Sequence, residues 1–311
     1  MLDDTFAKVS SWRPRHEAEA MFRNRLLIDF IYKEIPQTLL KYSSIEWSNG
    51  QPSENAPIWV CWLDGPNDLP DVVSRCIRSI CDHSAGHPVR FIDFNNISKY
   101  ASIPKRITSL LDDGRLNWAN FCDILRLMLL YEHGGLWLDA DIFVSKDIPE
   151  DYFSKPFATT KNNTVDIPRL ESLNYVGKER WHISIFGGQK GNSLFGFILD
   201  AFMEYFAAND ELQCYHFMDY SIELARRKYP QFAAALKDGA VYNGSHRKLG
   251  ISMKNGLPQS EYEDAIPPDT VFNVLNWRRD YPLLTEDGEA AVYSAFLNNP
   301  KADADHLLSL R

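Results

Sequence analysis

The amino-acid sequence predicts an α/β fold with a mostly parallel central sheet and a helical extension at the N-terminus. Short apolar segments of strand length alternate with stretches of helical periodicity. The strand segments span residues 57–63, 87–94 and 136–143, and the helical ones span residues 71–83, 104–114 and 117–133. Strands that alternate with helices favour a parallel, doubly wound sheet, which binds ligands at the carboxyl ends of its strands.

The N-terminal extension is predicted from a long amphipathic stretch at residues 16–42. Its apolar residues recur at helical spacing, so we expect one face to pack against the core, or alternatively to lie on a membrane surface or a partner. The polar segment "SSIEWSNGQPSENAP" follows and reads as a linker. We therefore divide the chain into an extension at 1–50 and a main domain at 51–311.

The second half of the main domain has a mixed pattern. The segment "ISIFGG" at residues 183–188 predicts a strand, and residues 193–208 and 217–229 predict helices. The last 80 residues are rich in loops, with "IPPD", "DYP" and "NNP" as breaks.

Composition and charge disfavour some classes of partner and some kinds of site. The 311 residues carry a formal net charge of −9, whereas a duplex-binding protein needs a basic surface, so nucleic acid is disfavoured. A substrate that carries phosphates would need a divalent cation to offset this charge. Five cysteines without a CxxC pair indicate neither a disulfide framework nor a zinc site. With an acidic N-terminus and no apolar run of membrane-spanning length, we expect a cytoplasmic location.

The stretch "FCDILRLMLLYEHGGLWLDAD" at residues 121–141 carries the chemistry. Asp123 and Arg126 lie three residues apart and are therefore neighbours on the predicted helix. A Gly-Gly pair ends that helix. In the strand that follows, Asp139 and Asp141 share one face because side chains alternate.

Two carboxylates at the end of one buried strand repel each other, and a cation between them reverses the sign of that interaction. Mg²⁺ and Mn²⁺ prefer hard oxygen ligands and commonly share them with substrate phosphates. The plain alternative is a solvated loop with two acids. The buried helix, the Gly-Gly turn and the hydrophobic strand favour a metal site instead.

The segment "CDILRLMLLYEHGGLWLDADIF" resembles the signature of DxD-sugar-binding glycosyltransferases and is similar to family thirty-two of that classification. The segments "GGLWLDADIFVSKDIP", "ISIFGGQKGNSLFGFILDAFMEYF" and "YHFMDYSIELA" resemble the bacterial capsular polysaccharide synthesis branch. The likeness covers roughly residues 57–230. It implies a GT-A-like Rossmann-type fold that binds a nucleotide-sugar, with a donor half at about 57–150 and an acceptor half at about 151–311.

The resemblance also implies roles for residues of the motif. Asp141 would bind the metal directly, and Asp139 would reach the ribose and the metal. Asp123 and Arg126 would hold the donor sugar or its diphosphate, with a structural salt bridge as the alternative.

Outside the motif, the resemblance implies that Trp62 stacks on the nucleotide base while the backbone near Cys61 contacts the base edge. A core aromatic is the alternative for Trp62. His246 and Lys254 would touch the diphosphate, or belong to a solvated loop. Asp219 would face the acceptor, or be an exposed acid on a helix, and we take it with Asp123 and Arg126 as a catalytic candidate.

The function implied is transfer of a hexose, dependent on Mn²⁺ or Mg²⁺, from a nucleotide-sugar such as a UDP-sugar. A glycan or lipid-linked glycan in capsule or surface polysaccharide synthesis would accept it, with retention at the anomeric carbon. Peripheral contact with a membrane or with the polysaccharide assembly machinery would fit this role. Three alternatives stay open: glycosylation of a protein, a phosphohydrolase or nucleotidyltransferase reaction, and a non-catalytic carbohydrate-binding subunit.

Overall fold

The computed structural model describes residues 8–53, 55–161, 173, 175–178 and 180–311. Its centre is a six-stranded sheet in the order β2-β1-β3-β6-β5-β7, and a two-stranded sheet pairs β4 with β8. The strands are β1 (Ile58–Cys61), β2 (Val89–Ile92), β3 (Gly135–Asp139), β4 (Ile142–Val144), β5 (Phe157–Lys161), β6 (Ile185–Gly188), β7 (Ala240–Tyr242) and β8 (Phe272–Val274).

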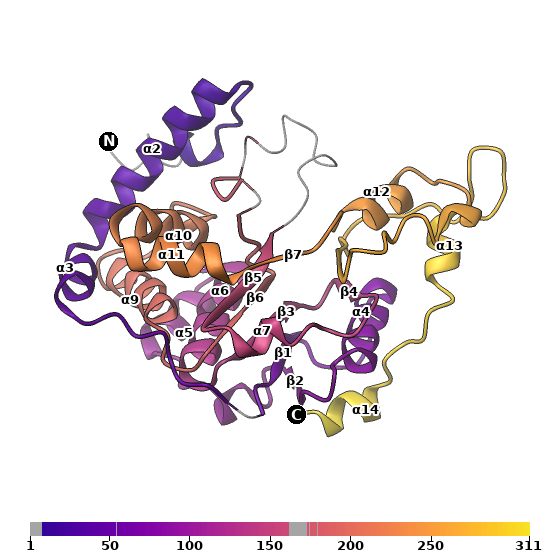
Figure 1. Cartoon of the computed structure of the whole chain (residues 1–311), viewed down its shortest axis with the longest axis horizontal. Helices are drawn as coiled ribbons and strands as arrows, with labels where there is room; N and C mark the ends of the chain where they lie inside the picture. Colours follow the sequence, from indigo (N-terminus) through magenta and orange to yellow (C-terminus); the bar gives the residue numbers. More distant parts are fainter. Residues whose placement is uncertain (1–7, 54, 162–172, 174, 179) are drawn as a thin grey trace.

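Helices cover both faces of the central sheet (Figure 1). The α-helices are α2 (Glu17–Glu34), α3 (Pro36–Ser44), α4 (Asp71–Asp82), α5 (Lys105–Asp112), α6 (Trp118–His133), α7 (Asp151–Ser154), α9 (Ser193–Ala208), α10 (Phe217–Lys228), α11 (Pro230–Gly239), α12 (Lys248–Lys254), α13 (Val292–Phe296) and α14 (Ala304–Ser309). None of these described helices has both the length and the apolar character that crossing a bilayer requires.

The predicted fold class is confirmed. In the central sheet β1–β2, β1–β3 and β5–β7 pair in parallel, whereas β3–β6 and β5–β6 pair antiparallel. Alternate side chains of each strand enter different cores. Trp59 and Trp137 pack with α6, α9 and α10, whereas Val60 and Leu138 pack with α4 and α7.

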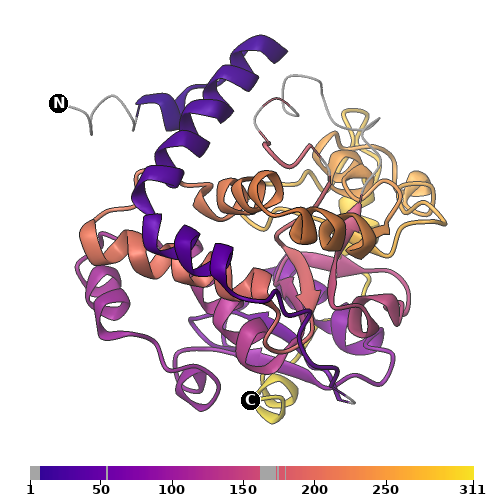
Figure 2. The same ribbon diagram turned by 60° about the vertical axis from the view of Figure 1, so that its left-hand side comes forward.

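The long N-terminal helix predicted at residues 16–42 is wrong in one respect, because it is two helices. Ile35 adopts φ −126° and ψ 47°, and Pro36 starts α3. Proline lacks a backbone N–H and disfavours the helical conformation in the residue before it, so α2 ends there. In both views α2 and α3 lie outside the helices that flank the sheet, α2 against α10 and α3 against α9 (Figures 1 and 2).

The continuous strand predicted at residues 136–143 is also wrong. The chain leaves the central sheet after Asp139, turns at Ala140 and Asp141, and pairs again as β4 with the distant β8. The hydrophobic run does not mark this break, because Ile142 and Val144 are as buried as the residues of β3. Consequently Asp139 ends a strand, while Asp141 lies in the turn beyond it.

The Gly-Gly turn between α6 and β3 is confirmed as the cap of the helix. Gly134 has φ +73° and its N–H donates to the Leu130 carbonyl at 2.9 Å. Gly135 has φ +100°, and a Cβ there would lie 2.1 Å from the Pro57 oxygen. That oxygen accepts the Leu136 N–H at 2.9 Å, so the close approach aligns β3 beside β1.

Gly135→Ala is expected to lower the free energy of unfolding by about 3 kcal/mol or more, because it combines a left-handed backbone with a steric clash. Gly86→Ala is the matched control, since Gly86 has φ +89° but open space around its Cβ, and about 1 kcal/mol is expected there. Urea unfolding measures both. Equal losses in the two variants would contradict this account of the turn.

Candidate active site

The site lies at the carboxyl ends of β1 and β3. Cys61 and Asp139 end these two strands and are register partners in the parallel ladder. The Asp139 Oδ1 accepts a hydrogen bond of 2.6 Å from the Trp137 indole Nε1, which projects from the same face of β3. Because side chains alternate along a strand, Trp137 and Asp139 both point toward α6.

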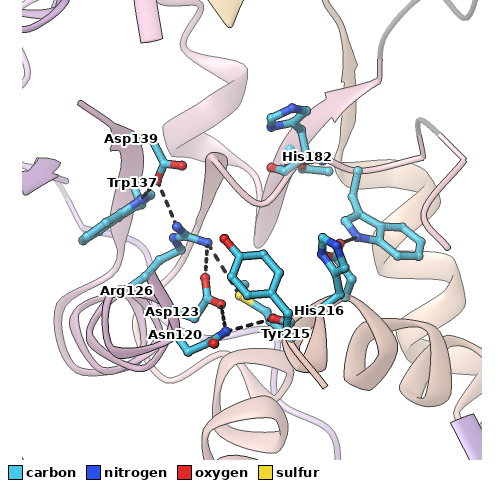
Figure 3. A network of polar contacts seen from close by, with 12 residues as sticks. Asn120, Asp123, Arg126, Trp137, Asp139, His182, Tyr215 and His216 are labelled. Carbon is cyan, nitrogen blue, oxygen red and sulfur yellow. Dashed lines mark hydrogen bonds and ion pairs between the residues drawn. The ribbon is translucent and has the colours of Figure 1, made fainter. Parts of the chain in front are cut away.

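Arg126 on α6 connects the acids (Figure 3). One guanidinium nitrogen lies 3.1 Å from the Asp123 Oδ1, and the other lies 2.9 Å from the Asp139 Oδ1. The guanidinium also lies over the Trp137 ring, 5.0 Å from its centroid. Because the Arg126 side chain is only 4% exposed, water does not screen these contacts strongly.

The base of this network is fixed by the first turn of α6. The Asn117 side chain caps the helix by accepting the Asn120 N–H at 2.9 Å. The Asn120 amide then donates to the Asp123 carboxylate at 3.3 Å and to the Tyr215 carbonyl at 2.8 Å. The same side chain therefore positions Asp123 and the loop that precedes α10.

The Arg126 guanidinium does not offset the negative charges of Asp123, Asp139 and Asp141 together. Burial disfavours the Asp139 anion, but Arg126 and hydrogen bonds from Ser184 and Trp137 outweigh burial and hold its pKa below the ordinary value. Burial raises the pKa of Asp123 to about 7, against the opposing effect of Arg126. Burial and the neighbouring Asp139 charge raise the pKa of Asp141 to about 7. Arg278 lowers the Asp141 pKa in the opposite direction but does not outweigh these effects, so the Asp141 charge is only partly compensated.

A C-terminal loop completes the surroundings of Asp141. The Leu275 N–H donates to the Asp141 carbonyl at 3.1 Å. Two residues further, the Trp277 ring meets Trp62 edge to face at 5.1 Å and lies under the Arg278 guanidinium at 4.4 Å. This loop brings an aromatic ring and a cation to the end of β1.

A cavity of about 1410 Å³ opens over these strand ends. It is lined by eight of the residues singled out from the sequence, namely Cys61, Trp62, Asp123, Arg126, Asp139, Asp141, Asp219 and Lys254. Their convergence from the ends of β1 and β3, from α6 and α10, and from α12 is what a binding site requires. The Cys61 thiol is hydrogen-bonded to Cys122 and buried, which raises its pKa and keeps it neutral.

His246 lies behind the wall of the cavity and is 1% exposed. Its ring is 5.4 Å from that of His182, which does line the cavity, and its Nε2 accepts a hydrogen bond of 3.1 Å from the Arg247 Nε. Burial lowers the pKa of His182 to about 4 and that of His246 to about 2. Both imidazoles are neutral near pH 7.

Asp219 projects from the first turn of α10. Its Oδ1 accepts a hydrogen bond of 2.8 Å from the Trp181 indole, and His216 lies 3.7 Å away. The Asp219 charge acts on both Asp123 and His182. The carboxylate therefore lies within electrostatic reach of the Arg126 network without pairing to Arg126.

Sequence reasoning missed several residues that line the cavity: His182, Tyr215, Arg247, Asn276, Trp277 and Arg278. The available signals were an aromatic residue followed by two arginines in the loop "NWRRD" and the adjacent tyrosine and histidine in "CYHFMD". Neither pattern has a spacing that links it to the DxD motif, because folding alone brings these segments together.

The residues present fit a cation that is shared with a phosphate ligand. Within the described part of the chain, no group of three or more His, Cys, Asp or Glu side chains could hold a metal ion alone. Asp139 and Asp141 supply two carboxylates, and Arg278 compensates the Asp141 charge only in part. Mg²⁺-type ions are commonly bound by one or two carboxylates plus substrate phosphates.

The fold and the site together define a class: an α/β protein that binds its ligand in a crevice at the carboxyl ends of parallel strands. The chain belongs to the family described as "Capsular polysaccharide synthesis protein", whose profile matches residues 11–288. The solved structure of "PaToxG Glycosyltransferase" is similar at a TM-score of 0.37 and 14% sequence identity, covering 70% of this chain and 88% of that chain. No curated protein sequence matches this chain.

Replacing Arg126 by Met is expected to cost about 3 kcal/mol of unfolding free energy at pH 7.5, because it leaves buried carboxylates without their counter-charge. In the wild type the Asp139 pKa is lowered, so its contribution is present above the unfolded-state pKa and is lost as the pH falls through the folded-state pKa. Without Arg126, burial is opposed less strongly, so the carboxyls of the variant take up protons at a higher pH than those of the wild type. The difference between variant and wild type should shrink for this reason between pH 7.5 and pH 4 in urea titrations.

Arg78→Met is the control for this prediction. Arg78 pairs with Asp82 at 2.9 Å on the surface, with the two side chains 35% and 40% exposed, so about 0.5 kcal/mol is expected. An Arg126→Met variant that loses no more than this control would show that the network is not a structural constraint.

Proposed function

We propose that this protein is a glycosyltransferase that moves a hexose from a nucleotide-sugar, such as a UDP-sugar, to a hydroxyl of a glycan or lipid-linked glycan during capsule synthesis. The observation that carries the proposal is the pair Asp139 and Asp141 at the edge of a large cavity, the first held as an anion by Arg126 and the second only partly compensated by Arg278. Membership of the capsular polysaccharide synthesis family supports this reaction class.

Asp139 and Asp141 are the residues that would hold Mn²⁺ or Mg²⁺. When bound, the cation supplies positive charge to the diphosphate of the donor and to the leaving group. The protein carries a net charge of −9, so it would repel this diphosphate without positive charge inside the cavity. Arg278 and Lys254, which line the cavity, add positive charge.

Donor recognition would rest on residues around the end of β1. Trp62 would stack on the nucleotide base, and the backbone at Cys61 would contact the base edge, since both line the cavity. Asp123 and Arg126 are fixed relative to each other by their ion pair, so their remaining hydrogen-bonding capacity is directed at the donor sugar.

The reaction breaks the bond between the anomeric carbon and the diphosphate oxygen and forms a bond from that carbon to the acceptor oxygen. The nucleoside diphosphate leaves with the electron pair of the broken bond. In a front-face route, which retains the anomeric configuration, the acceptor proton passes to the leaving oxygen. Asp219 would orient the acceptor hydroxyl, because its carboxylate is fixed by Trp181 on the cavity wall.

Asp141→Asn should abolish turnover while the fold survives. The substitution removes a charge that Asp139 repels, so thermal unfolding should not shift downward, whereas loss of stabilisation for the leaving group should reduce the rate by about a hundredfold or more. The measurement is slow donor hydrolysis in the presence of Mn²⁺ with a panel of nucleotide-sugars.

Asp238→Asn changes an exposed acid of α11 outside the cavity and serves as the control. A folded Asp141→Asn variant with the activity of this control would refute the metal assignment. Release of inorganic phosphate or pyrophosphate without free sugar would point to a phosphohydrolase or nucleotidyltransferase instead.

A further inference from the structure

The cavity is larger than one donor requires. Small-molecule sites typically occupy about 300–1,000 Å³, whereas this cavity measures about 1410 Å³. We divide its wall into two parts. The donor lobe comprises the ends of β1 and β3, the first half of α6, the end of α12 and the loop 274–279. The second lobe comprises residues 10–13, 23, 175, 177–178, 181–182, 214–216, 219–220 and 247.

Contacts between distant segments hold the second lobe together. Arg23 on α2 donates to the Trp12 carbonyl at 2.9 Å and to the Leu173 carbonyl at 3.3 Å. Arg247 lies over the Tyr175 ring at 5.2 Å, and that ring lies 6.4 Å from the His216 ring. The N-terminal extension, the segment before β6, the start of α10 and the residue before α12 therefore form one wall.

The two lobes differ in charge. The donor lobe balances four acids with four cations among its described lining residues, which are Asp64, Asp123, Asp139, Asp141, Arg126, Lys254, Arg278 and Arg279. Among its own described lining residues, the second lobe has four cations and one acid, which are Arg13, Arg23, Lys178, Arg247 and Asp219. This positive surface lies inside a protein whose net charge is −9, so it is a local feature and not a consequence of composition.

Lys178 contributes an exposed positive charge to the second lobe. Its backbone has φ 46°, a left-handed conformation that costs free energy in a residue with a Cβ and that is concentrated at functional positions. Its amine lies 3.0 Å from the Glu17 carboxylate, with the side chains 49% and 61% exposed. An exposed pair of this kind is weak, so an anionic ligand can replace Glu17 as the partner.

We propose that the second lobe binds the acceptor, and that the acceptor is an anionic glycan whose carboxylate or phosphate groups contact Lys178 and Arg247. This proposal rests on the proposed transfer reaction and adds the substrate class. Tyr175, which is 39% exposed, supplies aromatic surface for a sugar ring, and Arg247 supplies a planar guanidinium suited to carboxylate or phosphate. Asp219 would hold the end of the acceptor glycan near the donor lobe, because the Asp219 charge acts on Asp123 in that lobe.

The test measures oligosaccharide binding to the full chain by fluorescence anisotropy, with Mn²⁺ and saturating uridine diphosphate present to fill the donor lobe. The probes are hyaluronan hexasaccharide, which carries carboxylates, a glycerol phosphate hexamer, and neutral maltohexaose. At least one anionic probe should bind about tenfold tighter than maltohexaose, and added salt should reduce this preference. Which anionic probe binds tighter distinguishes a uronate-bearing acceptor from a phosphate-bearing one.

Lys178→Gln and Arg247→Gln should each weaken binding of the preferred anionic probe by about fivefold and leave maltohexaose unaffected. Arg247→Lys keeps the positive charge but loses the guanidinium that donates a hydrogen bond to His246. It should therefore retain part of the affinity, which separates the effect of charge from that of the guanidinium. Lys248→Gln, a neighbouring exposed lysine outside the cavity, is the matched control and should bind like the wild type.

Equal binding of charged and neutral probes, or Gln variants that bind like the Lys248→Gln control, would overturn the acceptor assignment. Donor hydrolysis by the wild type, measured separately, reports on the transfer reaction itself. Hydrolysis without any preference for anionic probes would overturn the second-lobe proposal alone, whereas absence of both would overturn the proposed function as well.

Discussion

The structure of the site depends on one guanidinium that serves more than one carboxylate. Arg126 binds Asp123 and Asp139 simultaneously and is almost fully buried, so its position is fixed by α6 and β3 together. Its charge keeps Asp139 ionised but leaves Asp123 and Asp141 with raised pKa values near 7. A buried ion pair adds little net stability relative to an apolar replacement, although removing one partner is costly, so folding alone does not account for this arrangement. The partly compensated charge of Asp141 is the feature that the proposed cation and diphosphate would complete.

Much of the fold was predictable because the signals are local. Helix α9 (Ser193–Ala208) matches its predicted bounds, and the turn at Gly134 and Gly135 follows from the conformational freedom of glycine. The break after Asp139 was not predictable from the run "LWLDADIFV", because pairing of β4 with β8, more than 120 residues away, decides it. Strands β5, β7 and β8 were missed for the same reason, since short strands depend on their partners more than on their own composition.

The site residues divide in the same way, into those that local sequence predicts and those that depend on contacts between distant segments. The spacing of Asp123 and Arg126 predicts that they are neighbours on one helix, and their contact at 3.1 Å agrees. The contact of Arg126 with Asp139 was not predicted, because it depends on how α6 packs against β3. Trp277 meets Trp62 only because β8, just before it, pairs with β4, and the local sequence "NWRRD" has no spacing that links it to the motif. For His246 the alternative of a solvated loop is wrong, because the side chain is 1% exposed and lies behind His182. Its role at the diphosphate stays a prediction.

The central claim is that a divalent cation and a nucleoside diphosphate occupy the Asp139–Asp141 edge together. The most direct measurement is calorimetric titration of uridine, guanosine, adenosine and thymidine diphosphates into the protein, with Mn²⁺ and then with excess chelator. The account predicts that one nucleotide binds at least tenfold tighter with Mn²⁺ and that Mn²⁺ alone binds weakly, because the described residues supply only two carboxylates at this edge. Nucleotide affinity unchanged by the chelator, or tight Mn²⁺ binding without any nucleotide, would contradict it.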